Sequence, residues 1–236
     1  MSNTLWLVVP AAGQGRRMGA DKPKQYLTLN NQPILAHTLA RLHAAFPQAR
    51  LVLCLDSDDR WFDPTWVPFA QWQRVSGGAE RMHSVLNALQ AMTAEDSDLV
   101  MVHDVARPCI TRDDLHVLYQ AAQTHSGGAL LAMPVADTMK RDNGDQLSQI
   151  TEPRDGLWHA LTPQSFRYSL LRHALEQAQQ TGTVVTDEAS AVEALGEAPR
   201  LVSGRRDNLK VTHPDDLALA AAILAAQSAT ASNRSS

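Results

Sequence analysis

The chain has 236 residues, 44% of them hydrophobic, with two cysteines and a formal net charge of −4. This length suffices for one large α/β domain that buries its own core, and we interpret Cys54 and Cys109 as reduced thiols. The acidic balance argues against general nucleic-acid binding, and the lack of a long apolar run argues against a membrane span. With no signal-peptide pattern at the N-terminus, we expect a cytoplasmic protein that binds neither nucleic acid nor a membrane.

The predicted elements alternate between strands and helices. Short apolar runs predict buried strands, and apolar residues at helical spacing predict helices. In chain order we expect a strand over 5–9, a helix over 33–45, a strand over 51–55, a helix over 81–92, a strand over 99–102, a helix capped by Thr111 that ends near 125, and a strand over 129–133. This alternation predicts an α/β fold whose mostly parallel sheet is flanked by helices. Ligands of such sheets bind beyond the carboxyl ends of the strands, so the loops after Val9, Val102 and Met133 should face one site.

The alternation is interrupted between 134 and 158. Two strand-like segments, 138–141 and 147–151, flank a segment that contains Asn143-Gly144, and Asn-Gly is a strong hairpin signal. An isolated hairpin is marginal in water, so we expect this one to pack on something, such as a second subunit. The α/β pattern then resumes and ends in a helix that Thr212 caps and that runs from about Pro214 to about Gln227. We expect one domain over 1–227, including a β-arm over 135–157, and a flexible tail over 228–236.

A glycine-rich basic loop follows the first strand. Its glycines allow several backbone N–H groups to converge on a phosphate. It is not a Walker A loop, since no Gly-Lys-Ser/Thr follows, and it is a poor dinucleotide fingerprint, since Met18 replaces the third glycine. A tight turn would explain the glycines but not the four nearby cations, which are Arg16, Arg17, Lys22 and Lys24. We therefore expect a triphosphate site, with Arg17 and Lys24 stabilising charge in a transition state.

Two further signals occur later in the chain. Asp104 follows a buried strand and suits Mg²⁺, which often takes one or two carboxylates beside substrate phosphates; pairing with Arg107 is the structural alternative. The segment GGAERMHS (77–84) leads into a helix; its glycines would let the backbone approach a base or a ribose, and Ser84 could hydrogen-bond to one, although a plain strand-to-helix turn explains the segment too. No nucleophile elbow and no zinc pattern occurs in the sequence.

Six motifs in order resemble the family of 2-C-methyl-D-erythritol 4-phosphate cytidylyltransferases. The resemblance runs from about Leu5 to Ala226. The motifs are PAAGQGRRM (10–18) with PKQY (23–26), HDVARP (103–108), DTMK (137–140), WHALTPQ (158–164), TDEAS (186–190) and NLKVT (208–212). The resemblance implies a Rossmann-like nucleotidyltransferase fold and a homodimer whose protruding arms are exchanged between subunits. His83 and Ala79 depart from the family pattern, which bears on base selectivity rather than on the reaction.

The resemblance also implies a role for each matching residue. The implied catalytic residues are Arg17, Lys24, Asp104 and Lys210, with Asp104 as the magnesium ligand. The implied CTP-binding residues are Ala11, Ala12, Gly13, Gly15, Arg16, Arg17, Lys24, Gly78, Ser84 and Asp104. The implied residues around the methylerythritol phosphate are Arg107, Thr138, Arg154, Thr162, Thr186 and Lys210. Arg154 lies on the arm and would serve the neighbouring subunit's site.

The implied reaction joins CTP to 2-C-methyl-D-erythritol 4-phosphate and releases pyrophosphate. It is a direct in-line attack that needs Mg²⁺ and positioned cations but no protein nucleophile. Three alternatives remain open at this stage. They are a cytidylyltransferase for another polyol phosphate such as ribitol 5-phosphate, a nucleotide-binding regulatory protein without catalysis, and a Rossmann oxidoreductase.

Overall fold

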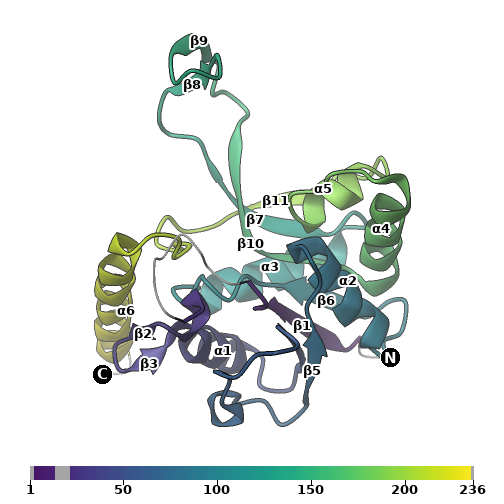
Figure 1. Ribbon diagram of the computed structural model, residues 1–236, viewed down its shortest axis with the longest axis vertical. Coiled ribbons are helices and arrows are strands. Elements are labelled where there is room, and N and C mark those ends of the chain that lie inside the picture. The colour runs from purple at the N-terminus through teal and green to yellow at the C-terminus, as the bar shows by residue number, and fades with distance from the viewer. Residues whose placement is uncertain (1–2, 14–21, 235–236) are drawn as a thin grey trace.

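The protein is built around one twisted seven-stranded sheet. The computed structural model describes residues 3–13 and 22–234, and the strand order is β11-β7-β10-β6-β1-β4-β5 (Figure 1). The strands of this sheet are β1 (Leu5–Pro10), β4 (Arg50–Leu55), β5 (Trp72–Ser76), β6 (Leu99–Val102), β7 (Ala129–Pro134), β10 (Trp158–Arg167) and β11 (Arg200–Ser203). The predicted strands over 5–9, 51–55, 99–102 and 129–133 are confirmed to within one residue at each end.

Most neighbouring strands are parallel. β1 pairs in parallel with β4 and β6, β4 with β5, and β7 with β11. β10 is the exception, because it runs antiparallel between β6 and β7. β5, β10 and β11 are strands that were not predicted from the sequence, but the predicted mostly parallel sheet is confirmed.

Helices cover both faces of the sheet, and strand alternation decides which core each residue joins. Leu5, Leu7 and Val9 pack in one buried cluster, whereas Trp6 and Val8 pack in the other. The long helices are α1 (Ile34–Ala45), α2 (Arg81–Ala91), α3 (Arg112–Thr124), α4 (Tyr168–Thr181) and α6 (Asp215–Arg234), with the short α5 (Glu188–Glu193) between α4 and β11. The predicted Thr111 cap is confirmed, because its hydroxyl accepts a hydrogen bond from the Asp114 amide at 3.2 Å.

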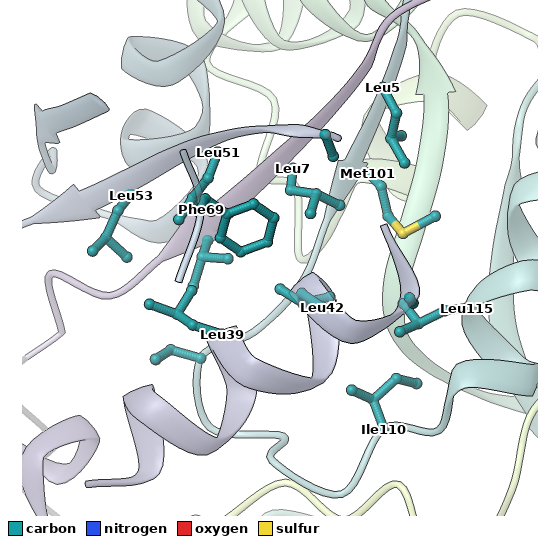
Figure 2. Packing of buried hydrophobic residues seen from close by; sticks show 14 of the residues in the cluster. Leu5, Leu7, Leu39, Leu42, Leu51, Leu53, Phe69, Met101, Ile110 and Leu115 are labelled. Atoms are coloured by element: carbon teal, nitrogen blue, oxygen red, sulfur yellow. The ribbon is translucent and has the colours of Figure 1, made fainter. Parts of the chain in front are cut away.

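The first core lies between the sheet and helices α1 and α3. Figure 2 shows Leu39 and Leu42 of α1 facing Leu7 of β1, with Phe69 beside them. Leu7, Leu39 and Leu42 are fully buried. Burying a leucine side chain contributes about 1.5–3 kcal/mol, so this layer fixes the strands whose ends form the site.

The second core lies on the opposite face, beneath α2, α4 and α5. Val85 and Leu89 of α2 pack there with Leu171 and Leu175 of α4. The same packing anchors the N-terminus of α2, which begins at Arg81, close to the ends of the parallel strands.

The chain end differs from the prediction. α6 continues to Arg234, well beyond Gln227, and packs through Ala220 and Leu224 on the small hairpin of β2 (Thr28–Leu29) and β3 (Gln32–Pro33). The predicted Thr212 cap is wrong, because the Thr212 hydroxyl donates to the Lys210 carbonyl instead. The Asp216 carboxylate accepts from the amides of Thr212 and His213 and so closes the turn before the helix.

The arm is a two-stranded hairpin that projects from the main sheet (Figure 1). β8 (Met139–Asp142) pairs antiparallel with β9 (Ser148–Glu152), which confirms the predicted hairpin with a shift of one residue. The connection is longer than a two-residue Asn-Gly turn, and Gly144 (φ 97°) and Gln146 (φ 62°) both take positive φ within it. Leu147 and Ile150 remain exposed on the arm.

Candidate active site

A cavity of about 520 Å³ opens at the carboxyl ends of the parallel strands. The loop after β1, the turn after β5 and the loop after β6 all contribute to its lining, as the topology of such sheets predicts. The predicted site residues that line it are Ala11, Ala12, Gly13, Lys24, Gly78, Ser84, Asp104 and Lys210. The expectation that the loop after Met133 shares this site is wrong for the described cavity, since that segment leads into the arm.

Asp104 is the electrostatic centre of the cavity. Its Oδ1 accepts from Arg81 Nε at 2.9 Å, its Oδ2 accepts from Lys210 Nζ at 2.7 Å, and Arg107 Nε lies 3.9 Å from Oδ2. Burial alone would raise the pKa of Asp104, but Arg81 and Lys210 outweigh it and hold the pKa well below its usual range. The carboxylate is therefore charged at any neutral pH.

Buried hydrogen bonds that involve Thr162 and His103 fix the backbone of Asp104. The Thr162 hydroxyl accepts from the Asp104 amide at 3.0 Å and lies 3.2 Å from His103 Nδ1. Burial lowers the pKa of His103 to about 4, so the ring is neutral at pH 7. Because His103 Nε2 contacts the Arg107 carbonyl at 3.1 Å, and a carbonyl only accepts, Nε2 carries the proton and Nδ1 accepts from Thr162.

Arg81 and Glu188 are functional candidates that the sequence analysis missed. Arg81 Nη1 and Nη2 donate to the two oxygens of Glu188 at 2.6 and 3.0 Å. Burial acts to lower the Arg81 pKa, but Glu188 and Asp104 together raise it. The three residues come from α2, the loop after β6 and the first turn of α5, so no local pattern in the sequence joins them.

The turn before α2 depends on its glycines for close packing. A Cβ on Gly78 would lie 2.3 Å from His83 Cβ, and a Cβ on Gly77 would lie 2.2 Å from Ala12 Cβ. The Ser84 hydroxyl accepts from the Gly78 amide at 3.0 Å and donates to the Glu80 carbonyl at 3.2 Å. The turn and the β1 loop therefore meet as one wall of the cavity.

The basic loop is described only in part. Lys24 Nζ donates to the Val211 carbonyl at 3.3 Å, next to Lys210, and thereby brings two predicted cations to the same side of the cavity. The buried Gln25 amide donates to the Ala11 carbonyl at 2.6 Å and ties this segment to the end of β1. The predicted residues Gly15, Arg16 and Arg17 lie outside the described residues.

The remaining predicted residues do not line this cavity. Thr162 and Arg107 are buried, and Arg107 donates to the Asn208 carbonyl at 2.7 Å, so both support the site rather than face it. Thr186 is exposed and lines a smaller cavity of about 200 Å³, which Arg81 also lines. Thr138 and Arg154 lie on the projecting arm, where an Arg154 N–H donates to the Ala136 carbonyl.

The cavity suits a divalent cation held jointly with a polyphosphate. Among the described residues, no group of three or more His, Cys, Asp or Glu side chains could hold a metal. Mg²⁺ needs no such cage, because it often binds one or two carboxylates and completes its shell with water and phosphate oxygens. The carboxylate of Asp104, which Arg81 and Lys210 keep ionised, is one hard oxygen group of that kind and would hold such a cation.

No helix in the described part of the chain is long and apolar enough to cross a membrane.

The profile of the 2-C-methyl-D-erythritol 4-phosphate cytidylyltransferase family matches residues 5–226. The chain is 61% identical over 228 residues to the protein of that name from Chromohalobacter salexigens, covering 96% of this chain and 92% of that one. The corresponding Shewanella amazonensis protein is 49% identical over 227 residues, covering 96% and 95%.

Solved structures agree in architecture. A crystal structure of a 4-diphosphocytidyl-2C-methyl-D-erythritol synthase superposes with a TM-score of 0.83 at 33% identity, covering 95% of this chain and 99% of that one. The Francisella tularensis 2-C-methyl-D-erythritol 4-phosphate cytidylyltransferase superposes with a TM-score of 0.81 at 33% identity, covering 94% and 100%. The shared architecture is the Rossmann-like nucleotidyltransferase fold, as expected from the sequence.

Proposed function

Since this chain belongs to the 2-C-methyl-D-erythritol 4-phosphate cytidylyltransferase family, we propose that it joins CTP to 2-C-methyl-D-erythritol 4-phosphate. The products are 4-diphosphocytidyl-2-C-methyl-D-erythritol and pyrophosphate. An oxygen of the acceptor phosphate forms a bond to the α-phosphorus of CTP. The bond from that phosphorus to the β-phosphate oxygen breaks, and its electron pair leaves with pyrophosphate.

The observation that carries this proposal is the arrangement of charge around Asp104. One ionised carboxylate lies among Arg81, Lys210 and Arg107 in a cavity that also exposes Lys24. A reaction between two phosphate-bearing substrates needs cations on both sides of the reacting phosphorus, because their negative charges repel. A regulatory nucleotide-binding protein has no need of this arrangement.

Each part of the cavity has a role in this reaction. The loop after β1, with Ala11, Ala12 and Gly13, holds the triphosphate, and the turn at Gly78 and Ser84 holds the cytosine. Arg17 and Lys24 stabilise the charge that builds on the α-phosphate, and Lys210 holds the acceptor phosphate beside it. Asp104 is the ligand of Mg²⁺, which neutralises the triphosphate when bound.

We further infer a cytoplasmic homodimer in which the arm reaches the neighbouring subunit. Thr138 and Arg154 lie on the arm and are not among the residues that line the cavity of their own chain, which supports a role for them in the other subunit. Leu147 is 63% exposed, so the arm carries apolar surface that a second copy would cover. Cys54 and Cys109 are free and buried, which fits a reducing compartment.

The test is pyrophosphate release with CTP and Mg²⁺, comparing 2-C-methyl-D-erythritol 4-phosphate with ribitol 5-phosphate as acceptors. We expect release with the first acceptor and little with the second. Preference for ribitol 5-phosphate would keep the reaction type and change the substrate. No release with either acceptor, although the protein binds CTP, would overturn the proposed activity.

A further inference from the structure

Glu188 is the buried end of an ion-pair chain that reaches the candidate metal ligand. Its side chain is 1% exposed, whereas that of Arg81 is 28% exposed and that of Asp104 is 9% exposed. Arg81 therefore bridges two carboxylates, with both Nη atoms turned to Glu188 and only Nε turned to Asp104. The sequence resemblance gives Glu188 no role.

Several hydrogen bonds fix the position of Glu188. It occupies the first turn of α5, directly after Asp187, which forms a capping box with Ser190. The side chain of the buried Gln164, on β10, makes two of these contacts. Its Nε2 donates to Asp187 Oδ2 at 2.7 Å, and its Oε1 accepts from the backbone amide of Ala189 at 2.8 Å. These contacts lock the backbone on both sides of Glu188, so its carboxylate has a fixed direction toward Arg81.

The pairing geometry determines what remains available on Asp104. A guanidinium group prefers to take both oxygens of a carboxylate in a fork. Both Nη atoms of Arg81 donate to Glu188, so only Nε remains for Asp104. Arg81 therefore engages Oδ1 of Asp104 and not Oδ2. Oδ2 is paired at 2.7 Å with Lys210, whose side chain is 42% exposed and can turn to a substrate phosphate.

We propose that Glu188 is a positioning residue that restrains Arg81 and so keeps Oδ2 of Asp104 available to a divalent cation. This inference rests on the proposed function, in which Asp104 binds the metal that accompanies CTP. Without Glu188, the Nη atoms of Arg81 lose their partner. Arg81 can then donate from Nε and one Nη atom to both oxygens of Asp104, and so competes with the cation for that carboxylate. Replacing a residue that orients a metal ligand typically weakens the site about 10- to 100-fold.

The experiment measures CTP binding by calorimetry, with and without Mg²⁺, and needs no turnover. In Glu188→Gln we expect the affinity for CTP to fall about tenfold when Mg²⁺ is present and to change less than about threefold without it. Glu176→Gln is the matched control, because it removes the partner of an exposed arginine, Arg172, at 2.8 Å. We expect that control to match the wild type in both conditions.

A double variant identifies Arg81 as the cause. In Arg81→Met with Glu188→Gln, the competing fork is gone and no buried charge is left without its partner. Arg81 lines the cavity, so its loss lowers CTP affinity in both conditions, and the readout is the ratio of the affinities with and without Mg²⁺. We expect that ratio to return to within about threefold of the wild-type ratio. This variant also serves as the test if Glu188→Gln alone does not fold, as judged by circular dichroism.

Three results would overturn the inference. They are an equal loss of affinity with and without Mg²⁺ in Glu188→Gln, no recovery in the double variant, and wild-type CTP binding that Mg²⁺ does not strengthen. Failure of the proposed function looks different, because the wild type would then bind CTP with Mg²⁺ and still transfer nothing to the acceptor.

Discussion

Asp104 combines burial with a full negative charge, and its neighbours explain how. Moving a lone carboxylate out of water is costly, so an unpaired Asp at this position would be protonated. Arg81 and Lys210, at 2.9 and 2.7 Å, reverse that tendency. The same cations line the cavity, so in the proposed reaction one cluster would both keep the carboxylate ionised and attract the phosphate-bearing substrates.

Lys24 gives the first prediction at the scale of a residue. Lys24→Ala should lower the turnover number roughly 10²–10³-fold, because it removes a preorganised donor that stabilises the transition state. The fold should persist, since the side chain is only partly buried and its hydrogen bond to Val211 is 3.3 Å long. Turnover is measured by pyrophosphate release, and folding by the urea midpoint.

Lys22→Ala is the control for that variant, because Lys22 is a nearby lysine that does not line the cavity. We expect its turnover within about threefold of the wild type, as screened surface charges act weakly at a distance. Near-wild-type turnover by Lys24→Ala, or equal losses in both variants, would remove the assigned role of Lys24.

Residues that lie next to strand ends were predictable from the sequence, and residues joined through space were not. Asp104 directly follows the predicted strand over 99–102, where a parallel sheet places its ligands, so position and residue type sufficed. Arg81 and Glu188 are 107 positions apart and meet because α5 packs in the same buried cluster as α2. In the sequence, Glu188 lies within the motif TDEAS (186–190), of which only Thr186 was assigned a role.

The same contrast holds at the scale of elements. Strands covered on both faces are continuous apolar runs, and β1, β4, β6 and β7 were found for that reason. β10 was missed because its first half, around His159, is exposed at the base of the arm and its second half buries Gln164 and Ser165. Its polar composition matches neither an apolar run nor a clean alternation.

The N-terminus of α3 carries the second prediction. Asp114, in the first turn, is 8% exposed, and its Oδ2 has no hydrogen-bond partner in the structure. Burial raises the pKa of Asp114 above its ordinary value of 3.8. In the window above 3.8, the folded state therefore binds more protons than the unfolded state, and this group lowers the free energy of unfolding as pH rises.

Asp114→Asn removes that titration and keeps a similar shape. We expect the stability of the variant relative to the wild type to increase between pH 4 and pH 7, whatever its value at pH 4. Urea unfolding at both pH values measures this difference. Asp113→Asn is the control, because Asp113 is an exposed neighbour in the same turn, and its relative stability should change less with pH. A relative stability of Asp114→Asn that is flat or falls with pH would contradict the assignment.

At the scale of the whole molecule, contacts within one chain do not explain why the arm projects and exposes apolar side chains. The hairpin of β8 and β9 forms its own two-stranded sheet and projects away from the main sheet (Figure 1). Two-stranded hairpins are marginal in water, and this one exposes Leu147 and Ile150. The sequence predicted the hairpin from Asn143-Gly144, but not the base of the arm, where β7 pairs with the ten-residue β10 as far as Pro134 and Trp158.

The proposed exchange of arms is tested by mixing two inactive proteins. Lys24→Ala damages the cavity of its own chain, and Arg154→Ala damages the arm. If the arm serves the neighbouring subunit, a mixed dimer holds one site with both residues intact and one site that lacks both. Unfolding and refolding an equimolar mixture should then form mixed dimers as about half of all dimers, and turnover should rise to roughly a quarter of the wild-type value. If Arg154 acts in its own chain, every site keeps one defect, and mixing restores no activity. Because both variants are inactive alone, the recovery reports which subunit supplies Arg154, independently of how much each residue contributes to the rate.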